Sequence, residues 1–469
     1  MFNELSAISP IDGRYRDHVK ELSDYSSEFA LIRYRTEIEI RYLIALSKAG
    51  IFRKLKKNEI KLLEEIFKGF NLEDAIENKD IAQEYWTPTK NSSSATKHDV
   101  KAVEYYLKQK LSSTSLSDIL EFIHFGLTSE DVNNLSIRLM LKGAFENVIL
   151  KSLKSLNKEI LNQSKKYKNL PMLGRTHGQP ATPTTLGKEF LVFYERLDKE
   201  IKILESSKLY GKLNGAVGSY NALNFSYPEI NWPKFSEDFI TSLGLDINQT
   251  TNQIAPFEDI IFVFQGVQRI NGIILDFNQD MWRYISDGWF IQENRKGEVG
   301  SSTMPQKINP IMFENSEGNL IIANSLIHGF IDKLPLSRLQ RDLSNSTISR
   351  NFGACLAYCL ISYKNTYSGL KRVRANEEKI AEDLNSDWSI LSEAIQTHLK
   401  KEGIKKGYEI IKDATRGKKF NQKDWLNLIN KLPISNEAKT KLSKLTPESY
   451  IGLSIQLVDS VLGETRSGK

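Results

Sequence analysis

Residues 297–310 read GEVGSSTMPQKINP and bring two adjacent serines, a lysine and an asparagine into one segment rich in glycine and proline. A polar segment of this size between helical patterns is either an ordinary linker or a functional loop. Its last two residues, Asn309 and Pro310, are typical of a helix start, where free N–H groups attract anions. A linker would leave the grouping of hydroxyls, lysine and amide unexplained, so we treat the segment as a candidate site.

A histidine lies in a second polar segment, LGRTHGQPATPTTLGKEF. His177 is flanked by glycine-rich sequence, and we expect a helix to begin just after it, at Thr182 and Pro183. A lone histidine often has a structural role, which stays the alternative here. The chain has only six histidines, and this one is the best acid or base candidate.

Two further motifs combine polar groups with helix starts. TKHDVKAVEYYL pairs His98 with Asp99, and HFGLTSEDVNNL places Thr128 or Ser129 as a helix cap before two acidic residues. Capping explains the second motif by itself. A capped helix N-terminus can also hold a substrate carboxylate, so both interpretations stand.

Several well-known chemistries lack their motifs in this sequence. There is no H-x-x-x-H, H-E-x-x-H or C-x-x-C metal motif, no P-loop, and no G-x-S-x-G serine-hydrolase elbow. The remaining serines, histidines, amides and cations suit acid–base chemistry on an anionic substrate. We therefore expect no metal and no organic cofactor.

Composition indicates a large helical protein. The 469 residues are 40% apolar and 26% charged, which excludes a mainly disordered, collagen-like or disulfide-stapled chain. At about 100 to 200 residues per domain, this length predicts two to four domains. The small numbers of proline (13) and glycine (27) favour long helices over a β architecture.

Charge and apolar patterning indicate where the protein acts. The formal charge of +6 is spread along the chain, so we expect no nucleic-acid partner. No uninterrupted apolar run approaches the 18 or so residues that span a bilayer, and no signal peptide is recognisable, so we expect no membrane partner. The only cysteines, Cys355 and Cys359, fit one buried helix face, and a cytoplasmic location follows.

Apolar residues repeat at alternating spacings of three and four in four stretches, which predicts long helices with narrow apolar seams. The seams are Ile260, Val263, Val267, Ile270, Ile274, Phe277, Met281 and Tyr284; Leu186, Phe190, Phe193, Leu197, Ile201 and Leu204; Ile149, Leu153, Leu156 and Ile160; and Phe352, Leu356, Cys359, Tyr363 and Leu370. They predict an all-α chain with a long-helix bundle over residues 118–370, between a helical domain at 1–117 and a small helical domain at 371–469. Such a bundle favours a homo-oligomer.

The motifs resemble a known enzyme family. GSSTMPQKINP looks like the signature loop of the fumarase/aspartase superfamily. Together with seven other motifs it resembles the bacterial-type branch of the adenylosuccinate lyase family, along the whole chain and in order. These motifs are SPIDGRY, KHDVKAVEY, HFGLTSEDVNNLS, GRTHGQPATP, GKLNGAVGSYNA, FENSEGN and RLQRDLSNSTISRN.

The resemblance implies a fold, a reaction and an assembly. It implies an all-α, three-domain fold, and a homotetramer in which each active site takes loops from three subunits. The implied reactions release fumarate from adenylosuccinate, giving AMP, and from succinylaminoimidazole carboxamide ribotide, in purine biosynthesis. Neither reaction requires a metal or an organic cofactor.

The resemblance also implies roles for individual residues. Ser301 matches the base and His177 the acid that protonates the departing nitrogen, while Lys307 and Asn309 face the carboxylate where charge develops. The phosphate and ribose end matches Arg14, Tyr15, Arg341, Ser346 and Arg350. The succinyl contacts match Thr128, Ser129 and Gln253. The other implied substrate-binding positions are Lys97, His98, Asp99, Ile308, Asn315, Thr347, Ile348 and Ser349.

Two positions depart from the family pattern, which usually has His at 306 and Asn at 97. Gln306 gives the MPQK sequence of argininosuccinate lyases, which are the alternative within the superfamily. The arginines of the phosphate end oppose that alternative, because argininosuccinate carries no phosphate. Lys97 could tighten anion binding or lower the pKa of His98. A catalytically inactive helical scaffold is a further alternative, opposed by the presence of Ser301, His177 and Lys307.

Overall fold

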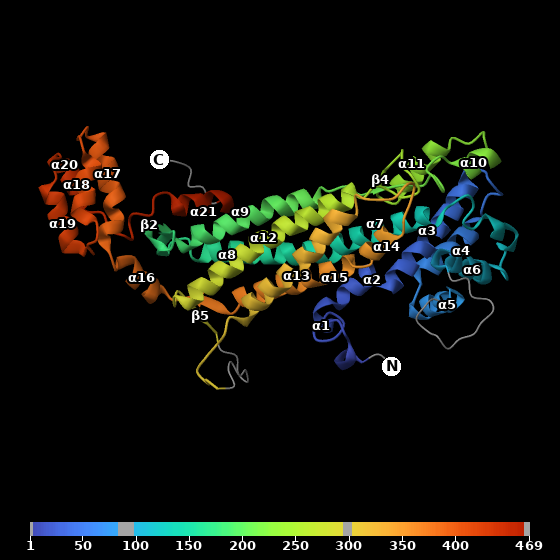
Figure 1. The fold of residues 1–469 in the computed structure, drawn as a ribbon, viewed down its shortest axis with the longest axis horizontal. Coiled ribbons are helices and arrows are strands. Elements are labelled where there is room, and N and C mark those ends of the chain that lie inside the picture. Colours follow the sequence, from blue (N-terminus) through green and yellow to red (C-terminus); the bar gives the residue numbers. More distant parts are fainter. Residues whose placement is uncertain (1–2, 83–97, 294–302, 464–469) are drawn as a thin grey trace. The chain divides into compact units, whose positions relative to one another are not determined.

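The structure, a computed structural model, describes residues 3–82, 98–293 and 303–463. Regular structure in these ranges is mostly helical, which confirms the predicted all-α class (Figure 1). The longest helices are α3 (Glu28–Lys48), α6 (Asp99–Leu111), α7 (Ser129–Ala144), α8 (Leu150–Lys166), α9 (Leu186–Glu205), α12 (Glu258–Ser286), α13 (Ile311–Lys333) and α15 (Phe352–Leu370).

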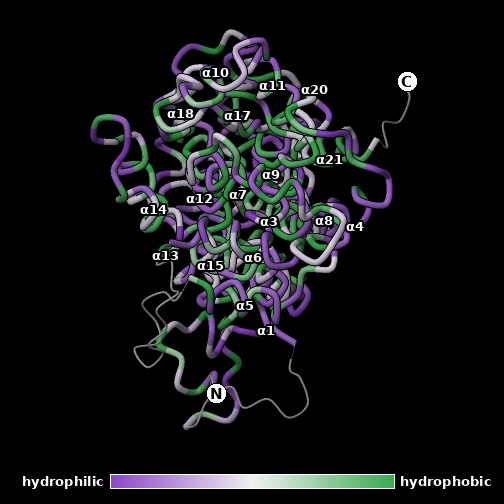
Figure 2. Tube along the Cα trace, turned by 90° about the vertical axis from the view of Figure 1, so that its right-hand side faces the viewer, coloured by the Kyte–Doolittle hydropathy of each residue, from purple (hydrophilic) through white to green (hydrophobic). Residues whose placement is uncertain are grey.

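Shorter helices connect and surround the long ones. They are α1 (Arg16–Val19), α2 (Ser23–Ser26), α4 (Lys57–Lys68), α5 (Leu72–Ala82), α10 (Asn221–Ser226), α11 (Trp232–Ser242), α14 (Ser344–Ser349), α16 (Glu377–Asn385), α17 (Ser392–Lys401), α18 (Gly407–Thr415), α19 (Gln422–Lys431), α20 (Asn436–Ser443) and α21 (Ser454–Leu462). Apolar and polar residues alternate along individual helices, as expected where one helix face is buried (Figure 2).

The four predicted seams lie on buried helix faces. In α12, every seam residue from Ile260 to Met281 is buried, and Tyr284 is partly exposed. The seams of α9 and α15 are buried throughout, and so are the two free cysteines of α15, Cys355 and Cys359. Alternating spacings of three and four keep these side chains on one face of a helix with 3.6 residues per turn.

Helix α12 is also long and apolar enough to cross a membrane by length and composition. It is the one such helix among the described residues, with a mean hydropathy of 1.3 over its most apolar 18-residue window. Because 56% of that window is buried inside the protein, α12 fits the core helix of a globular protein.

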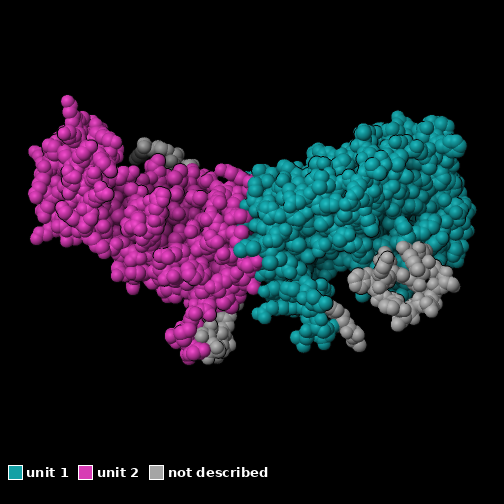
Figure 3. Space-filling view, in the orientation of Figure 1, with its two compact units in different colours: residues 1–153, 201–271, 319–362 teal, residues 154–200, 272–318, 363–469 magenta. Residues whose placement is uncertain are grey.

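The chain forms two compact units (Figure 3). Unit 1 comprises residues 1–153, 201–271 and 319–362, and unit 2 comprises residues 154–200, 272–318 and 363–469. Each has its own apolar core: Leu43, Leu63 and Tyr106, and separately Tyr42, Trp232 and Phe239, pack in unit 1, whereas Trp388, Ile395 and Trp425 pack in unit 2. The three-domain division expected from the sequence stays a prediction.

Within the part of the chain that the structure describes, strands form three short pairs, which the sequence pattern did not indicate. Antiparallel β1 (Pro171–Thr176) and β2 (Gln179–Thr185) make a hairpin; β3 (Tyr210–Gly211) pairs in parallel with β4 (Asp246–Ile247), and β5 (Phe290–Gln292) pairs antiparallel with β6 (Val373–Ala375).

The β1–β2 hairpin corrects one prediction. Thr182 and Pro183 do not begin a helix but lie in β2, and α9 begins at Leu186. A two-stranded ribbon tolerates the prolines, because each strand has a free edge. The turn residues His177 and Gly178 both have positive φ, 52° and 72°, as the tight two-residue turns of hairpins require.

Candidate functional site

The N-terminus of α7 carries the predicted cap. Thr128 is the N-cap residue, and its N–H donates to the Oδ2 of Asp131 at 2.9 Å. Ser129 is the first helical residue, and the following Glu130 and Asp131 are buried. The capping prediction is confirmed, and Thr128 and Ser129 lie partly exposed at a helix end that favours anions.

His98 and Asp99 begin α6. His98 is its N-cap, and its Nδ1 accepts a hydrogen bond from the N–H of Lys101 at 3.2 Å. The Oδ2 of Asp99 lies 3.4 Å from Nη1 of Arg35 and 3.4 Å from Nη2 of Arg350. The structure therefore brings Asp99 and Arg350, 251 residues apart in the chain, into one cluster.

Arg35 and Glu28, both on α3, are members of this cluster that sequence reasoning missed. Arg350 Nη1 lies 3.1 Å from the Oε2 of Glu28, and Arg35 Nε donates to Asn133 at 2.8 Å. Burial lowers the pKa of Arg35, and the nearby carboxylates of Asp99 and Glu28 oppose that effect. The one sequence signal that could have indicated this cluster was an arginine placed among the apolar residues of a helical pattern.

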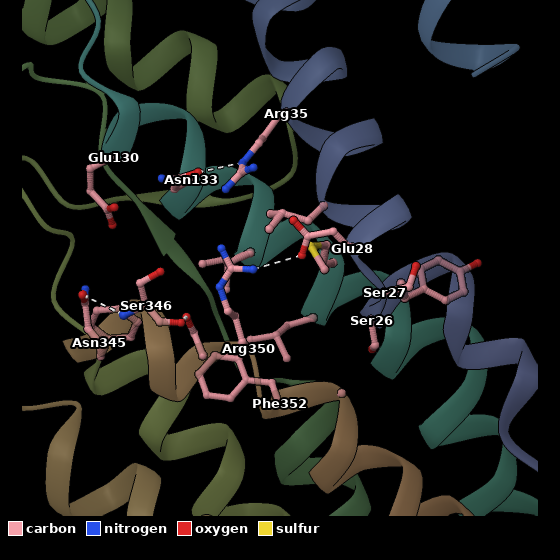
Figure 4. A pocket seen from close by; sticks show the side chains of 18 residues that line it. Ser26, Ser27, Glu28, Arg35, Glu130, Asn133, Asn345, Ser346, Arg350 and Phe352 are labelled. Atoms are coloured by element: carbon pink, nitrogen blue, oxygen red, sulfur yellow. Dashed lines mark hydrogen bonds and ion pairs between the residues drawn. The ribbon is translucent and has the colours of Figure 1, made fainter. Parts of the chain in front are cut away.

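A cavity of about 150 Å³ opens beside these residues (Figure 4). α3 contributes Glu28 and Arg35 to its wall, and α7 contributes Glu130 and Asn133. The third side comes from α14 and the residues that follow it. The members from this third side are Asn345, Ser346, Ser349, Arg350, Phe352 and Gly353. Guanidinium groups and hydroxyls facing one cavity can bind a phosphate group.

Arg341 extends the polar wall toward the cap of α7. Its Nη1 donates to the Oε1 of Gln253 at 2.9 Å, and its Nη2 lies 3.5 Å from the Oε2 of Glu130. Burial raises the pKa of Glu130, while the positive charge of Arg341 opposes that rise. Gln253 and Arg341, predicted to contact opposite ends of a substrate, are thus in direct contact.

The remaining predicted residues of unit 1 lie on two short segments. Arg14 is exposed and Tyr15 half-buried in the turn before α1. Thr347 and Ile348 lie within α14, where Thr347 is exposed and Ile348 half-buried.

The predicted acid and the described part of the loop belong to unit 2. His177 is exposed at the tip of the hairpin, and Lys307 is exposed in the segment before α13. The carbonyl of Ile308 accepts from Gln292 Nε2 at 2.8 Å, and Asn315 accepts from Asn365 Nδ2 at 2.6 Å.

Two predicted residues cannot be placed, and one helix start needs a small correction. Ser301 and Lys97 lie outside the described residues. Helix α13 begins at Ile311, one residue later than the Asn309–Pro310 start predicted, and the Pro310 carbonyl accepts from the N–H of Glu314 at 3.3 Å. In the described ranges, no group of three or more His, Cys, Asp or Glu residues could hold a metal ion.

Two family models match the chain. A model described as "Lyase" matches residues 13–323, and one described as "Adenylosuccinate lyase C-terminal" matches residues 337–451.

Curated relatives match over nearly the whole length. The adenylosuccinate lyase of Haemophilus influenzae is 45% identical over 461 residues, which cover 97% of this chain and 99% of that protein. The enzymes of the same name from Escherichia coli K12 and Dictyostelium discoideum are 42% and 44% identical, over 98% and 96% of this chain and 99% and 97% of those proteins.

Solved structures share the fold. A fumarate lyase from Mesorhizobium sp. BNC1 superposes with a TM-score of 0.74 at 17% identity, over 96% of this chain and 98% of that one. A 3-carboxy-cis,cis-muconate lactonizing enzyme from Pseudomonas putida superposes with a TM-score of 0.72 at 17% identity, over the same shares of the two chains.

Proposed function

The chain belongs to the adenylosuccinate lyase family of the fumarase/aspartase superfamily, and we propose that it releases fumarate from adenylosuccinate, giving AMP. The second substrate is succinylaminoimidazole carboxamide ribotide, which places both reactions in purine biosynthesis. One observation carries the proposal: Arg350 and Ser346 line one cavity of unit 1 together with Glu130, which follows the Thr128 cap in the first turn of α7. A succinylated nucleotide has a phosphate at one end and carboxylates at the other. Arg350 and Ser346 suit the phosphate, and the helix end at Thr128 favours an anionic group.

The proposed contacts divide between the two ends of the substrate. Arg350, Ser346 and Ser349, with Arg14 and Tyr15, hold the phosphate and ribose, since guanidinium forks suit phosphate oxygens. Thr128, Ser129 and Gln253 hold the succinyl group. The further contacts come from Lys97, His98, Asp99, Ile308, Asn315, Arg341, Thr347 and Ile348.

The chemical problem is to remove a weakly acidic proton from the carbon beside a carboxylate. Ser301 takes this proton, and Lys307 with loop N–H groups stabilises the serine alkoxide. Lys307 and Asn309 then face the carboxylate where negative charge accumulates, and one such donor typically contributes about 2.7 to 4 kcal/mol. Closure of the loop over substrate excludes water and strengthens these contacts.

The reaction ends when the C–N bond breaks. His177 donates a proton to the departing nitrogen, which leaves as a neutral amine. A positioned acid of this kind typically accelerates a reaction by about 100- to 10,000-fold. His177 is exposed at the tip of the β1–β2 hairpin, which leaves its imidazole ring accessible to substrate.

The assembly is a cytoplasmic homotetramer with active sites shared among three subunits, built from three helical domains. Exposed apolar residues on long helices support self-association: Phe262 on α12 and Ile321 and Ile322 on α13 are each about half exposed. We expect neither nucleic acid nor membrane as a partner, and neither a metal nor an organic cofactor.

The direct test follows the absorbance change when adenylosuccinate is added to purified protein. Argininosuccinate is assayed in parallel by fumarate release, because Gln306 matches the loop of that alternative family. Turnover of adenylosuccinate alone supports the proposal and makes Gln306 a neutral variation. Turnover of argininosuccinate alone would refute it and would mean that the phosphate-end arginines had been misinterpreted.

A further inference from the structure

A lysine and an aspartate form an ion pair deep inside unit 1. Lys212 Nζ lies 2.8 Å from the Oδ1 of Asp131, and both side chains are fully buried, at 0% exposed. The substrate contacts proposed above use neither residue. Asp131 is nevertheless the residue that receives the N–H of Thr128, the cap of α7.

The chain around Lys212 wraps the Asp131 carboxylate. The Oδ1 of Asp131 accepts from the backbone N–H groups of Asn214 at 3.1 Å and Gly215 at 3.3 Å. Lys212 Nζ also donates to the Gly215 carbonyl at 2.8 Å. The side-chain amide of Asn134 bonds the backbone of Lys212: its Nδ2 donates to the Lys212 carbonyl, and its Oδ1 accepts from the Lys212 N–H. The path of residues 212–215 is therefore set by one buried carboxylate and its lysine.

This buried segment leads directly into a turn that contacts Gln253, a predicted succinyl contact. Gly215 is buried and Ala216 is exposed. The Ala216 carbonyl accepts from Gln253 Nε2 at 2.8 Å, and Asn214 Nδ2 donates to the Thr251 hydroxyl at 2.9 Å. The ion pair is thus connected to Gln253 on one side and to Thr128 on the other.

The connection closes into a ring. Gln253 accepts from Arg341, and Arg341 pairs with Glu130, the neighbour of Asp131 on α7. Gln253 and Arg341 are half-buried, Glu130 lines the cavity wall, and Ala216 is exposed. Because each hydrogen bond or ion pair of the ring restrains both of its members, displacing one member is expected to disturb its neighbours.

We propose that the buried pair of Lys212 and Asp131 positions the dicarboxylate end of the substrate site. It sets the distance between the Thr128–Ser129 turn and the Gln253 amide, which receive the succinyl group. This role rests on the proposed function, since it assumes a succinylated substrate. A buried ion pair typically adds little net stability over apolar residues of similar volume, so its main effect here is on geometry.

The test compares two variants, in which a lysine or an arginine is replaced by methionine. Each replacement removes the cation that pairs with a buried carboxylate. Lys212→Met removes the pair at the site. Arg53→Met is the matched control, since Arg53 lies 3.0 Å from the buried Glu59 and its described partners, which also include Asp118 and Ser115, are not among the site residues. Measurements are the KM and kcat for adenylosuccinate, the Kd of AMP by calorimetry, and the thermal unfolding midpoint.

We expect Lys212→Met to raise the KM for adenylosuccinate by about tenfold or more, because contacts to the succinyl group lose their alignment. The Kd of AMP, which has no succinyl group, stays within about twofold of the unaltered protein. Arg53→Met lowers the unfolding midpoint but leaves both constants unchanged. If Lys212→Met does not fold, Thr251→Val decides: it cuts the link to Asn214 and should raise the same KM while sparing AMP.

The outcomes separate the inference from the proposed function. Equal effects of Lys212→Met on adenylosuccinate and AMP, or an unchanged KM in a folded Lys212→Met or Thr251→Val protein, would overturn the positioning role alone. Absence of adenylosuccinate turnover by the unaltered protein would overturn the proposed function, and the positioning role with it.

Discussion

Arg341 donates a hydrogen bond to the side chain of Gln253 at 2.9 Å, although 88 residues separate them in the chain. Gln253 in turn donates to the carbonyl of Ala216. The family resemblance implied that Arg341 and Gln253 contact opposite ends of a substrate, and the structure makes them neighbours. A change at one is therefore expected to alter the contacts of the other.

Ser301→Ala tests the assigned base. We expect kcat to fall by at least about 100-fold, because no other positioned group removes the substrate proton. Circular dichroism and size-exclusion chromatography should show unchanged helix content and assembly. Ser302→Ala is the control and should retain most activity. Substantial activity in Ser301→Ala with normal folding would remove Ser301 as the base.

Mixing inactive subunits tests whether sites are shared. Ser301→Ala and His177→Ala proteins are each expected to be inactive, since each lacks one proton-transfer group. After dissociation and reassembly together, some sites receive an intact serine and an intact histidine from different subunits, so activity partly returns. Fumarate release is the measurement, and each variant reassembled alone is the control. Mixed tetramers without any recovery would argue that each site is built within one subunit.

Gly218→Ala tests the turn that follows residues 212–215. Gly218 has a φ of +80°, and a Cβ there would lie 1.9 Å from the carbonyl oxygen of Thr251. Gly417 has a similar φ of +73° but open space around it, so Gly417→Ala is the control. We expect Gly417→Ala to cost about 1 to 2 kcal/mol of unfolding free energy.

Gly218→Ala should lower the free energy of unfolding more than Gly417→Ala does. It should also raise the KM for adenylosuccinate, because the clash displaces the turn whose Ala216 carbonyl bonds Gln253. Urea unfolding and steady-state kinetics measure the two effects. The same stability loss in both variants, with no change in KM, would contradict the tight packing of Gly218 against Thr251.

Arg53→Met should make stability respond differently to pH. The Arg53 guanidinium bonds the buried Glu59 carboxylate and lowers its pKa to about 2. A lowered pKa in the folded state contributes stability that is present above the unfolded value of about 4.3 and is lost as pH falls through about 2. The difference in unfolding midpoint between the unaltered protein and Arg53→Met is therefore largest near neutral pH and shrinks toward pH 2.

Differential scanning calorimetry between pH 3 and pH 7 measures this difference. Lys61→Met is the control, because the Lys61–Glu65 pair is 3.6 Å apart and mostly exposed, and such pairs contribute little. A midpoint difference for Arg53→Met that stays constant over the whole range would show that Glu59 does not depend on Arg53 for its ionisation.

The sequence alone determined the helical class and the buried faces. The seam of α12 follows from spacings of three and four residues, which place side chains on one face whatever surrounds the helix. The cap at Thr128 was also predictable, because a helix start is decided by residues within one turn. The motif order was also sufficient to indicate the family.

Tertiary structure decided which of these elements meet. No local pattern shows that Arg35 and Arg350 share Asp99, or that Lys212 and Asp131 are buried together, because these contacts join residues that are distant in the chain. The β1–β2 hairpin was missed because its prolines look like helix or loop signals, while its strands are stabilised by pairing with each other. Apolar periodicity indicates which face of a segment is buried. The partner of a polar side chain depends instead on packing between segments.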